Sequence, residues 1–130
     1  MSKKLLEPAI EDLHNEHKDW ISDMQFHKDE MKFFEDLLSL NLPKIKTDEQ
    51  KAQLEHLQNK LIYFKGELID KFLHDAKVHE FNLEKALESD HYDEDDLYKD
   101  HLKYRDDFKA LHRDILDYKK ELFDFIISLK

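Results

Sequence analysis

The sequence predicts an all-α protein, an elongated up-down-up antiparallel three-helix bundle with coiled-coil-like packing that dimerisation would complete. Its composition supports this class, because a 130-residue chain with one glycine, two prolines and 40% charged residues is typical of long helices. Apolar residues recur at alternating spacings of three and four along three stretches, which is the period of helices packed side by side. The breaks between these stretches are short, and short connections make neighbouring helices antiparallel. We therefore expect one domain over residues 1–130, with helices at about 8–40, 48–88 and 95–130.

The first predicted helix carries an apolar seam over residues 6–38. We expect Pro8 in its first turn, where the N–H that proline lacks has no helical partner to lose. Two seam positions hold histidine, His17 and His27, where a packed helix normally buries an apolar side chain. Pro43 cannot continue a helix and disfavours helical geometry in the residue before it, so it predicts the first connection.

The second predicted helix begins with a recognisable cap. Thr47 as the N-cap residue and Gln50 three positions later form the pattern of a capping box. Its seam has successive spacings of four between Leu68 and Ala76, which predicts a local shift of the apolar stripe across the helix face. The only glycine, Gly66, precedes this shift, and we expect it to permit a close approach of a neighbouring helix or a slight bend.

The third predicted helix has an unbroken seam over residues 97–129, with His101 at one position. Ser89, Asp90 and Asp93 are the candidates for its N-cap, and the acidic residues that follow Asp93 suit the positive end of the helix dipole.

Composition also excludes several classes of function. The chain has no cysteine, so disulfides, thiol catalysis and thiolate metal sites are ruled out. Its net charge of −10 would repel nucleic acid. One glycine cannot build a phosphate-binding loop and no serine lies in a nucleophile elbow, so the sequence favours a protein that is not an enzyme. Without a signal-like N-terminus or a long apolar run, we expect a soluble cytoplasmic protein that does not enter a membrane.

One end of the predicted bundle has more apolar residues than a single stripe per helix requires. We expect these residues to form a homodimer or other protein interface, unless a wide core accommodates them. They come from all three helices: Phe33, Leu37, Ile62, Phe123, Ile126 and Ile127.

The opposite half of the predicted bundle gathers histidines from three helices. Antiparallel register brings five residues to similar levels, and together they form a candidate metal site: His14, His17, Asp75, His79 and His101. Imidazole and carboxylate ligands of this kind suit zinc, iron, manganese or copper. The alternative is a structural polar layer in which Asp75, Tyr104, Arg105 and His79 satisfy one another without metal.

The remaining histidines are expected to have ordinary roles. His56, His74, His91 and His112 lie off the seams and should be solvated. His27 is expected to be a buried histidine that hydrogen-bonds Tyr118, Glu121 or Lys65, with no second histidine near it.

Two functions follow from these features. The first is a non-enzymatic helical-bundle protein that acts by self-association or by binding a protein partner, and it rests on the apolar end. The alternative is a bundle that binds a transition metal for storage, sensing or redox chemistry, and it rests on the histidine cluster. A third, in which the acidic surface acts as a decoy for a nucleic-acid-binding protein, rests on charge alone.

Overall fold

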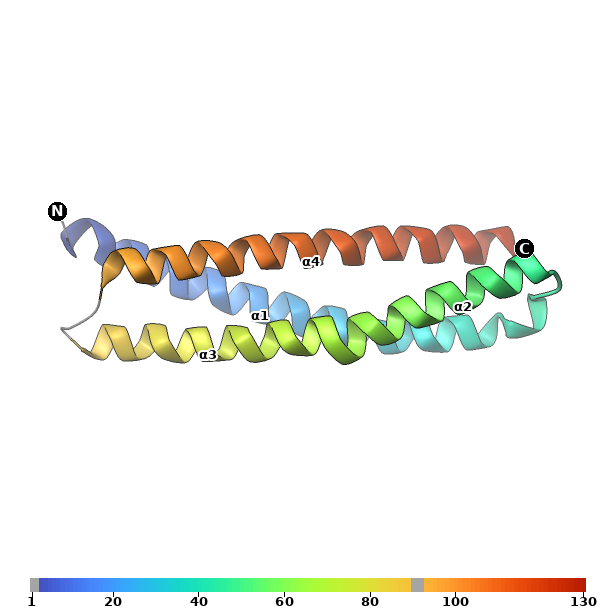
Figure 1. The fold of residues 1–130 in the computed structure, drawn as a ribbon, viewed down its shortest axis with the longest axis horizontal. Helices are drawn as coiled ribbons and strands as arrows, with labels where there is room; N and C mark the ends of the chain where they lie inside the picture. The colour runs from blue at the N-terminus through green and yellow to red at the C-terminus, as the bar shows by residue number, and fades with distance from the viewer. Residues whose placement is uncertain (1–2, 90–92) are drawn as a thin grey trace.

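The protein is an elongated bundle of long helices (Figure 1). The computed structural model describes residues 3–89 and 93–130, and their side chains except at 3–10 and 94. No strand occurs in these ranges, so the predicted all-α class is confirmed. In chain order the elements are α1 (Lys3–Leu40), the 3₁₀ turn η1 (Leu42–Lys44), α2 (Asp48–Tyr63), the π-helical turn η2 (Phe64–Leu68), α3 (Ile69–Glu88) and α4 (Glu94–Ser128).

The segments α2, η2 and α3 follow one another without a break and match the single helix predicted at 48–88. The predicted capping box is confirmed, because the Thr47 hydroxyl accepts from the Gln50 N–H at 3.0 Å and Gln50 Oε1 accepts from the Thr47 N–H at 3.1 Å. Figure 1 shows the rod changing direction between α3 and α2, at the π-helical turn. A π-helical turn widens the helix locally, so the buried stripe passes from Phe64 to Ile69.

Two details of the predicted second helix need correction. Leu68, placed on the seam, is only half-buried, whereas its neighbour Ile69 is fully buried, because the π-helical turn rotates the stripe by one residue. Of the two roles expected for Gly66, a close approach of helices is wrong, because a Cβ there would meet nothing within 4 Å. The other expected role, a slight bend, agrees with the position of Gly66 inside the π-helical turn, where the rod changes direction (Figure 1).

The other helix ends differ slightly from the predicted ones. α1 begins at Lys3, so Pro8 lies beyond the first turn, where it forgoes one backbone hydrogen bond close to the end of the helix. α4 begins at Glu94, and its N-cap is one of the three candidates: the Asp93 carboxylate accepts from the N–H groups of Asp95 and Asp96. Asp90 and His91 lie outside the described residues.

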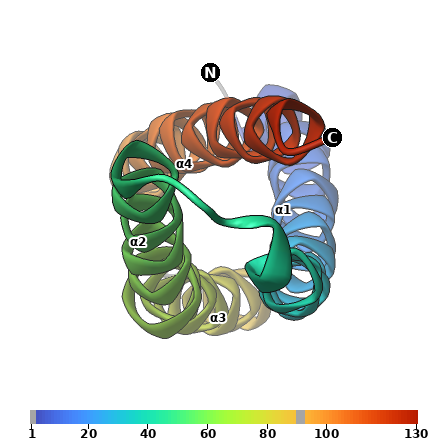
Figure 2. The same cartoon turned by 90° about the vertical axis from the view of Figure 1, so that its right-hand side faces the viewer.

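The helices surround a common core, as the end view in Figure 2 shows. Almost completely buried apolar side chains come from every helix, among them Met24, Met31, Leu57, Leu61, Ile69, Leu83, Ile115 and Leu122. Tyr118 is 1% exposed and donates its hydroxyl to the carbonyl oxygen of Leu57 at 2.8 Å, so even this buried polar atom is paired. None of the described helices combines the length and apolar character that a membrane span requires.

The apolar end is partly absorbed into the core. Leu37 and Ile126 are half-buried and pack against it, whereas the other predicted members are exposed: Phe33, Ile62, Phe123 and Ile127. Exposed apolar side chains also occur nearer the middle of the bundle and in its other half, for example Phe26 and Phe81. Exposed apolar side chains therefore occur at this end of the bundle and also in other parts of it.

Candidate metal centre

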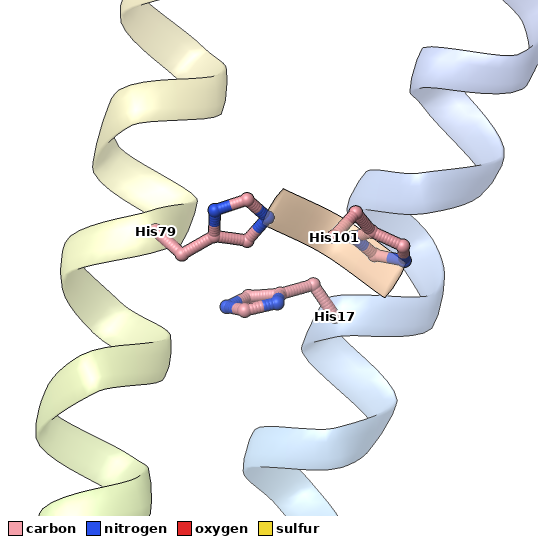
Figure 3. Close-up of side chains that lie close together, drawn as sticks. All are labelled: His17, His79 and His101. Atoms are coloured by element: carbon pink, nitrogen blue, oxygen red, sulfur yellow. The ribbon is translucent and has the colours of Figure 1, made fainter. Parts of the chain in front are cut away.

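Three buried histidines from three helices meet in the core: His17 of α1, His79 of α3 and His101 of α4 (Figure 3). Their side chains are 0%, 3% and 0% exposed, respectively. The ring centroids lie 5.0 Å apart for His17 and His79, 5.7 Å for His79 and His101, and 6.2 Å for His17 and His101. Each ring offers one nitrogen, and these three nitrogens all lie within 4.8 Å of one another.

Hydrogen bonds at the outer nitrogens determine where two of the rings carry their lone pairs. The Nε2–H of His17 donates to the carbonyl oxygen of Ala76, and a carbonyl can only accept. The Nε2–H of His101 donates to Glu16 Oε1 at 2.8 Å, and an ionised carboxylate can only accept. Because a neutral imidazole has one N–H and one lone pair, the lone pair of each ring is on Nδ1.

The inner nitrogens have no such partners. His17 Nδ1, His79 Nε2 and His101 Nδ1 are buried and make no hydrogen bond within the described part of the chain. Buried polar atoms are nearly always paired, and leaving one unpaired costs about 1–3 kcal/mol. Three such atoms in one cluster indicate a binding site for a ligand that is not part of the chain.

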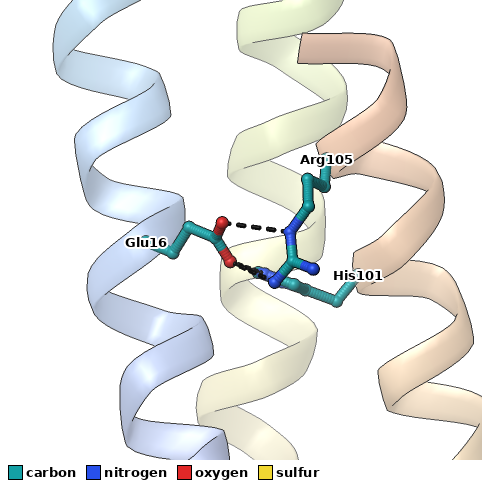
Figure 4. Close-up of polar contacts among 3 residues, drawn as sticks. All are labelled: Glu16, His101 and Arg105. Carbon is teal, nitrogen blue, oxygen red and sulfur yellow. Dashed lines mark hydrogen bonds and ion pairs between the residues drawn. The ribbon is translucent and has the colours of Figure 1, made fainter. Parts of the chain in front are cut away.

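An ion pair across the helices supports His101 from outside the cluster (Figure 4). Glu16 accepts two hydrogen bonds from Arg105, from Nη2 to Oε1 at 2.8 Å and from Nε to Oε2 at 3.0 Å. Partial burial tends to raise the pKa of the Glu16 carboxyl, but the hydrogen bonds from Arg105 and His101 outweigh it, so this pKa lies below its usual value. The carboxylate thus stays ionised and orients the His101 ring.

Burial keeps the clustered histidines neutral. It lowers the pKa of His17 and of His101, and the hydrogen bonds to Ala76 and Glu16 only partly offset this effect. Burial, together with the neighbouring His17 and His101, lowers the pKa of His79 to about 4. At neutral pH all three rings therefore have a free lone pair, as a metal ligand must.

Aromatic side chains cover the cluster. The ring of Trp20, the only tryptophan, stacks on His101 with centroids 4.6 Å apart and meets His17 edge-on at 5.3 Å. The Tyr104 ring lies 4.6 Å from that of His79. This apolar shell excludes water and lowers the local dielectric, which strengthens any electrostatic interaction inside it.

The other two predicted ligands point elsewhere. His14 is half-buried and groups with Glu80 and Glu84, whose candidate ligand atoms lie within 4.8 Å of its own. Asp75 belongs to neither group and lines a groove of about 380 Å³ between α3 and α4 with Lys71 and Lys103. The five predicted residues therefore do not form a single ligand set in this structure.

The residue that orients His101, Glu16, was not predicted from the sequence. Glu16 lies beside the seam and belongs to no motif. Arg105 was expected to hydrogen-bond with Asp75 and His79, but it binds Glu16 instead. The available signal was position alone, since Glu16 directly precedes His17 and so flanks the buried stripe.

The prediction for His27 is wrong in its partners. Its Nδ1–H donates to Glu30 Oε1 at 2.9 Å, and its Nε2 lies 3.0 Å from Nδ1 of His112, so a second histidine is near after all. His112, expected to be solvated, is half-buried and stacks on Phe108. His56 and His74 are exposed, as predicted.

Comparisons with protein-family models, with curated proteins and with solved structures found no match to this chain. Its function must therefore be inferred from its own residues.

Proposed function

We propose that the protein binds a transition-metal ion of the zinc or copper class through His17, His79 and His101. The observation that carries this proposal is the convergence of three neutral, buried imidazoles whose inner nitrogens lack a partner within the described part of the chain. Imidazole nitrogen suits zinc and copper, whereas manganese prefers carboxylate oxygen. The apolar end made association the first expectation from the sequence, whereas the geometry of the three histidines supports metal binding more strongly.

The surroundings of the cluster support this proposal. Histidines that bind metal usually donate their other N–H to a carboxylate or a backbone carbonyl, which fixes the tautomer and the orientation of the ring. His101 does so to Glu16 and His17 does so to Ala76. A purely structural histidine would need its second nitrogen paired as well, and here it is not.

Small movements would complete the coordination. Three nitrogens at a zinc–nitrogen distance of about 2.0–2.1 Å in a tetrahedron are about 3.3 Å apart. Side-chain rotations that bring the nitrogens together by an ångström or so reach this spacing from the 4.8 Å limit within which they lie. Three protein ligands leave a fourth position for water or an added ligand, which suits sensing or exchange of the metal.

Metal-dependent stability tests this proposal against a structural polar layer. Tag-free, EDTA-treated protein should gain about 2.7 kcal/mol in its free energy of unfolding when free zinc reaches a hundred times the dissociation constant. The variants His79→Ala and His79→Leu should lose this gain, and the second keeps the site filled. His74→Ala, an exposed histidine of the same helix, is the matched control and should keep it. An equal zinc effect in all variants, or none in the wild type, would remove the proposal.

Trp20 offers an independent readout of the same site. Because its ring stacks on His101, bound copper should quench the only tryptophan of the chain, while zinc with its filled d shell should not. Copper quenching that persists in His79→Ala would place the copper elsewhere.

We also propose that the three long helical rods run up, down and up, so that neighbouring rods in the chain are antiparallel. The second rod consists of α2, η2 and α3. Its contacts with α1 are antiparallel, because residue numbers rise along α1 while those of their partners fall, as in His17 with Ala76 and Lys28 with Asp70. Contacts of α1 with α4 pair residue numbers that rise together, as in Glu16 with Arg105 and Glu30 with Lys119. This order supports an up-down-up antiparallel three-helix bundle.

A second candidate function is self-association through the apolar end, which the exposure of Phe33 (59%), Ile62 (64%) and Ile127 (63%) favours. The proposed occupant is a second copy of the chain. Sedimentation at tens of micromolar should then report a dimer that Phe33→Glu with Ile127→Glu dissociates. Phe81→Glu, at an exposed apolar position in the other half, should leave it intact. A wild-type monomer at these concentrations would end this candidate.

A further inference from the structure

A second group of possible ligands lies beside the three-histidine cluster, at the surface of the bundle. His14 on α1 and both Glu80 and Glu84 on α3 each place a ligand atom within 4.8 Å of the others. His14 is one helical turn from His17, and Glu80 directly follows His79 in the chain. The carboxylate of Glu80 is near enough to act electrostatically on the pKa of His17, so the two groups are close neighbours.

This second group is also unsatisfied. Nδ1 of His14 is buried and has no hydrogen-bond partner in the described part of the chain. No lysine or arginine whose side chain is described pairs with Glu80 or Glu84, in contrast to Glu16, Glu30 and Glu35 elsewhere. Two carboxylates that face an imidazole without a compensating cation repel each other, and a bound cation removes this repulsion.

We propose that His14, Glu80 and Glu84 form a second cation site, which holds a divalent metal ion at the surface beside the three-histidine cluster. One imidazole and two carboxylates make a harder ligand set than three imidazoles, so this site suits manganese or iron(II). Exposure increases from half-buried His14 and Glu80 to exposed Glu84, so the ion reaches the site directly from water. The buried cluster, in contrast, is closed by Trp20 and its neighbours.

Manganese is the probe that separates the two sites, because it favours carboxylate oxygen. Titration of EDTA-treated protein with Mn²⁺, followed by loss of the six-line EPR signal of the free ion, should give one specific site. Salt at about 150 mM and millimolar magnesium suppress diffuse attraction to the acidic surface, and magnesium is a poor competitor where an imidazole is a ligand.

Variants assign the manganese site to its residues. His14→Ala, and separately the pair Glu80→Gln and Glu84→Gln, should each weaken Mn²⁺ binding by more than about tenfold, since even groups outside the first ligand shell contribute that much. His79→Ala should keep the manganese affinity, and Glu55→Gln, which removes an exposed acid of α2, is the matched control for charge.

Two results would overturn this inference: manganese binding that magnesium abolishes, or an affinity that is the same in the wild type and in both sets of variants. Its failure is separable from that of the proposed function. Zinc stabilisation that depends on His79 without a manganese site would remove only the second site. Manganese binding without zinc stabilisation would remove only the first.

Discussion

His101 and His27 both lie buried in the core. Each donates a ring N–H to a glutamate, and that glutamate also forms an ion pair with a basic residue. Around His101 these residues are Glu16 and Arg105. Around His27, Lys119 lies 2.7 Å from the carboxylate oxygen of Glu30 that accepts from His27. Up to this point the two regions are alike.

The two regions differ at the second nitrogen of the buried ring. Nε2 of His27 meets the Nδ1 of His112, so both nitrogens of His27 are paired within the protein. Nδ1 of His101 faces His17 and His79 and has no partner in the described part of the chain. The comparison teaches that burial and a carboxylate partner do not by themselves mark a metal ligand. The feature that separates His101, a proposed ligand, from His27 is the unpaired nitrogen.

Lowering the pH should produce the largest effect, because the pKa of His79 in the cluster is lowered more strongly than that of His27. In metal-free protein the pKa of His79 is lowered to about 4, while the unfolded chain titrates near 6.5. The unfolded state therefore binds more protons between these values, and the free energy of unfolding should fall as pH drops from about 6.5 to about 4, by about 3 kcal/mol for His79 alone. Urea unfolding between pH 7.5 and pH 4 measures the fall.

NMR titration of the ring protons assigns this effect to residues. His79 should have its midpoint near pH 4, whereas the hydrogen bond to Glu30 opposes the lowering of the pKa of His27 by burial, so His27 should titrate above His79. A His79 midpoint at or above that of His27 would contradict the distinction between the two regions.

The carboxylates offer the next test. Glu16→Gln removes the charge that orients and polarises His101, and it should weaken zinc binding by about 10- to 100-fold, the usual contribution of a partner behind a metal ligand. Glu30→Gln makes the same change behind His27 and is the matched control. Zinc affinity from a competitive chelator assay should be unchanged in Glu30→Gln. Equal affinities in the two variants would show that Glu16 does not support a ligand.

His112 provides the smallest expected effect. His112→Ala leaves Nε2 of His27 without its partner, which should destabilise the fold by about 1 kcal/mol, because His112 is only half-buried and water can partly replace it. Chemical denaturation measures this loss. Zinc-dependent stabilisation should stay the same, and a change in it would mean that the two regions are coupled.

Much of the fold could be predicted, because it depends on local patterns. The alternating seam placed His17, His79 and His101 in the core, and the capping box placed the start of α2 at Asp48. The π-helical turn could be predicted only as a shift of the seam. Its consequence, the exchange of Leu68 for Ile69 in the core, depends on how the neighbouring helices pack.

The composition of the site could be predicted only in part. His14 and His17 are three residues apart, which leaves their side chains about 60° apart around the helix axis. That angle is enough to turn His17 into the core and His14 towards Glu80 and Glu84. Asp75 is likewise rotated from His79 into the groove between α3 and α4. Levels along the bundle axis and the residues of the seam could be predicted, but the directions of residues beside the seam, such as His14 and Asp75, could not.

The sequence by itself determined that the chain forms long helices and that histidines occupy buried positions along them. Both follow from spacing within a single helix, which the chain specifies residue by residue. Only the tertiary structure decided which ring nitrogens are paired, as with Glu16 across from His101 and His112 across from His27. A hydrogen bond requires its donor and acceptor to be placed to within less than an ångström. That placement is set only when the helices pack against one another.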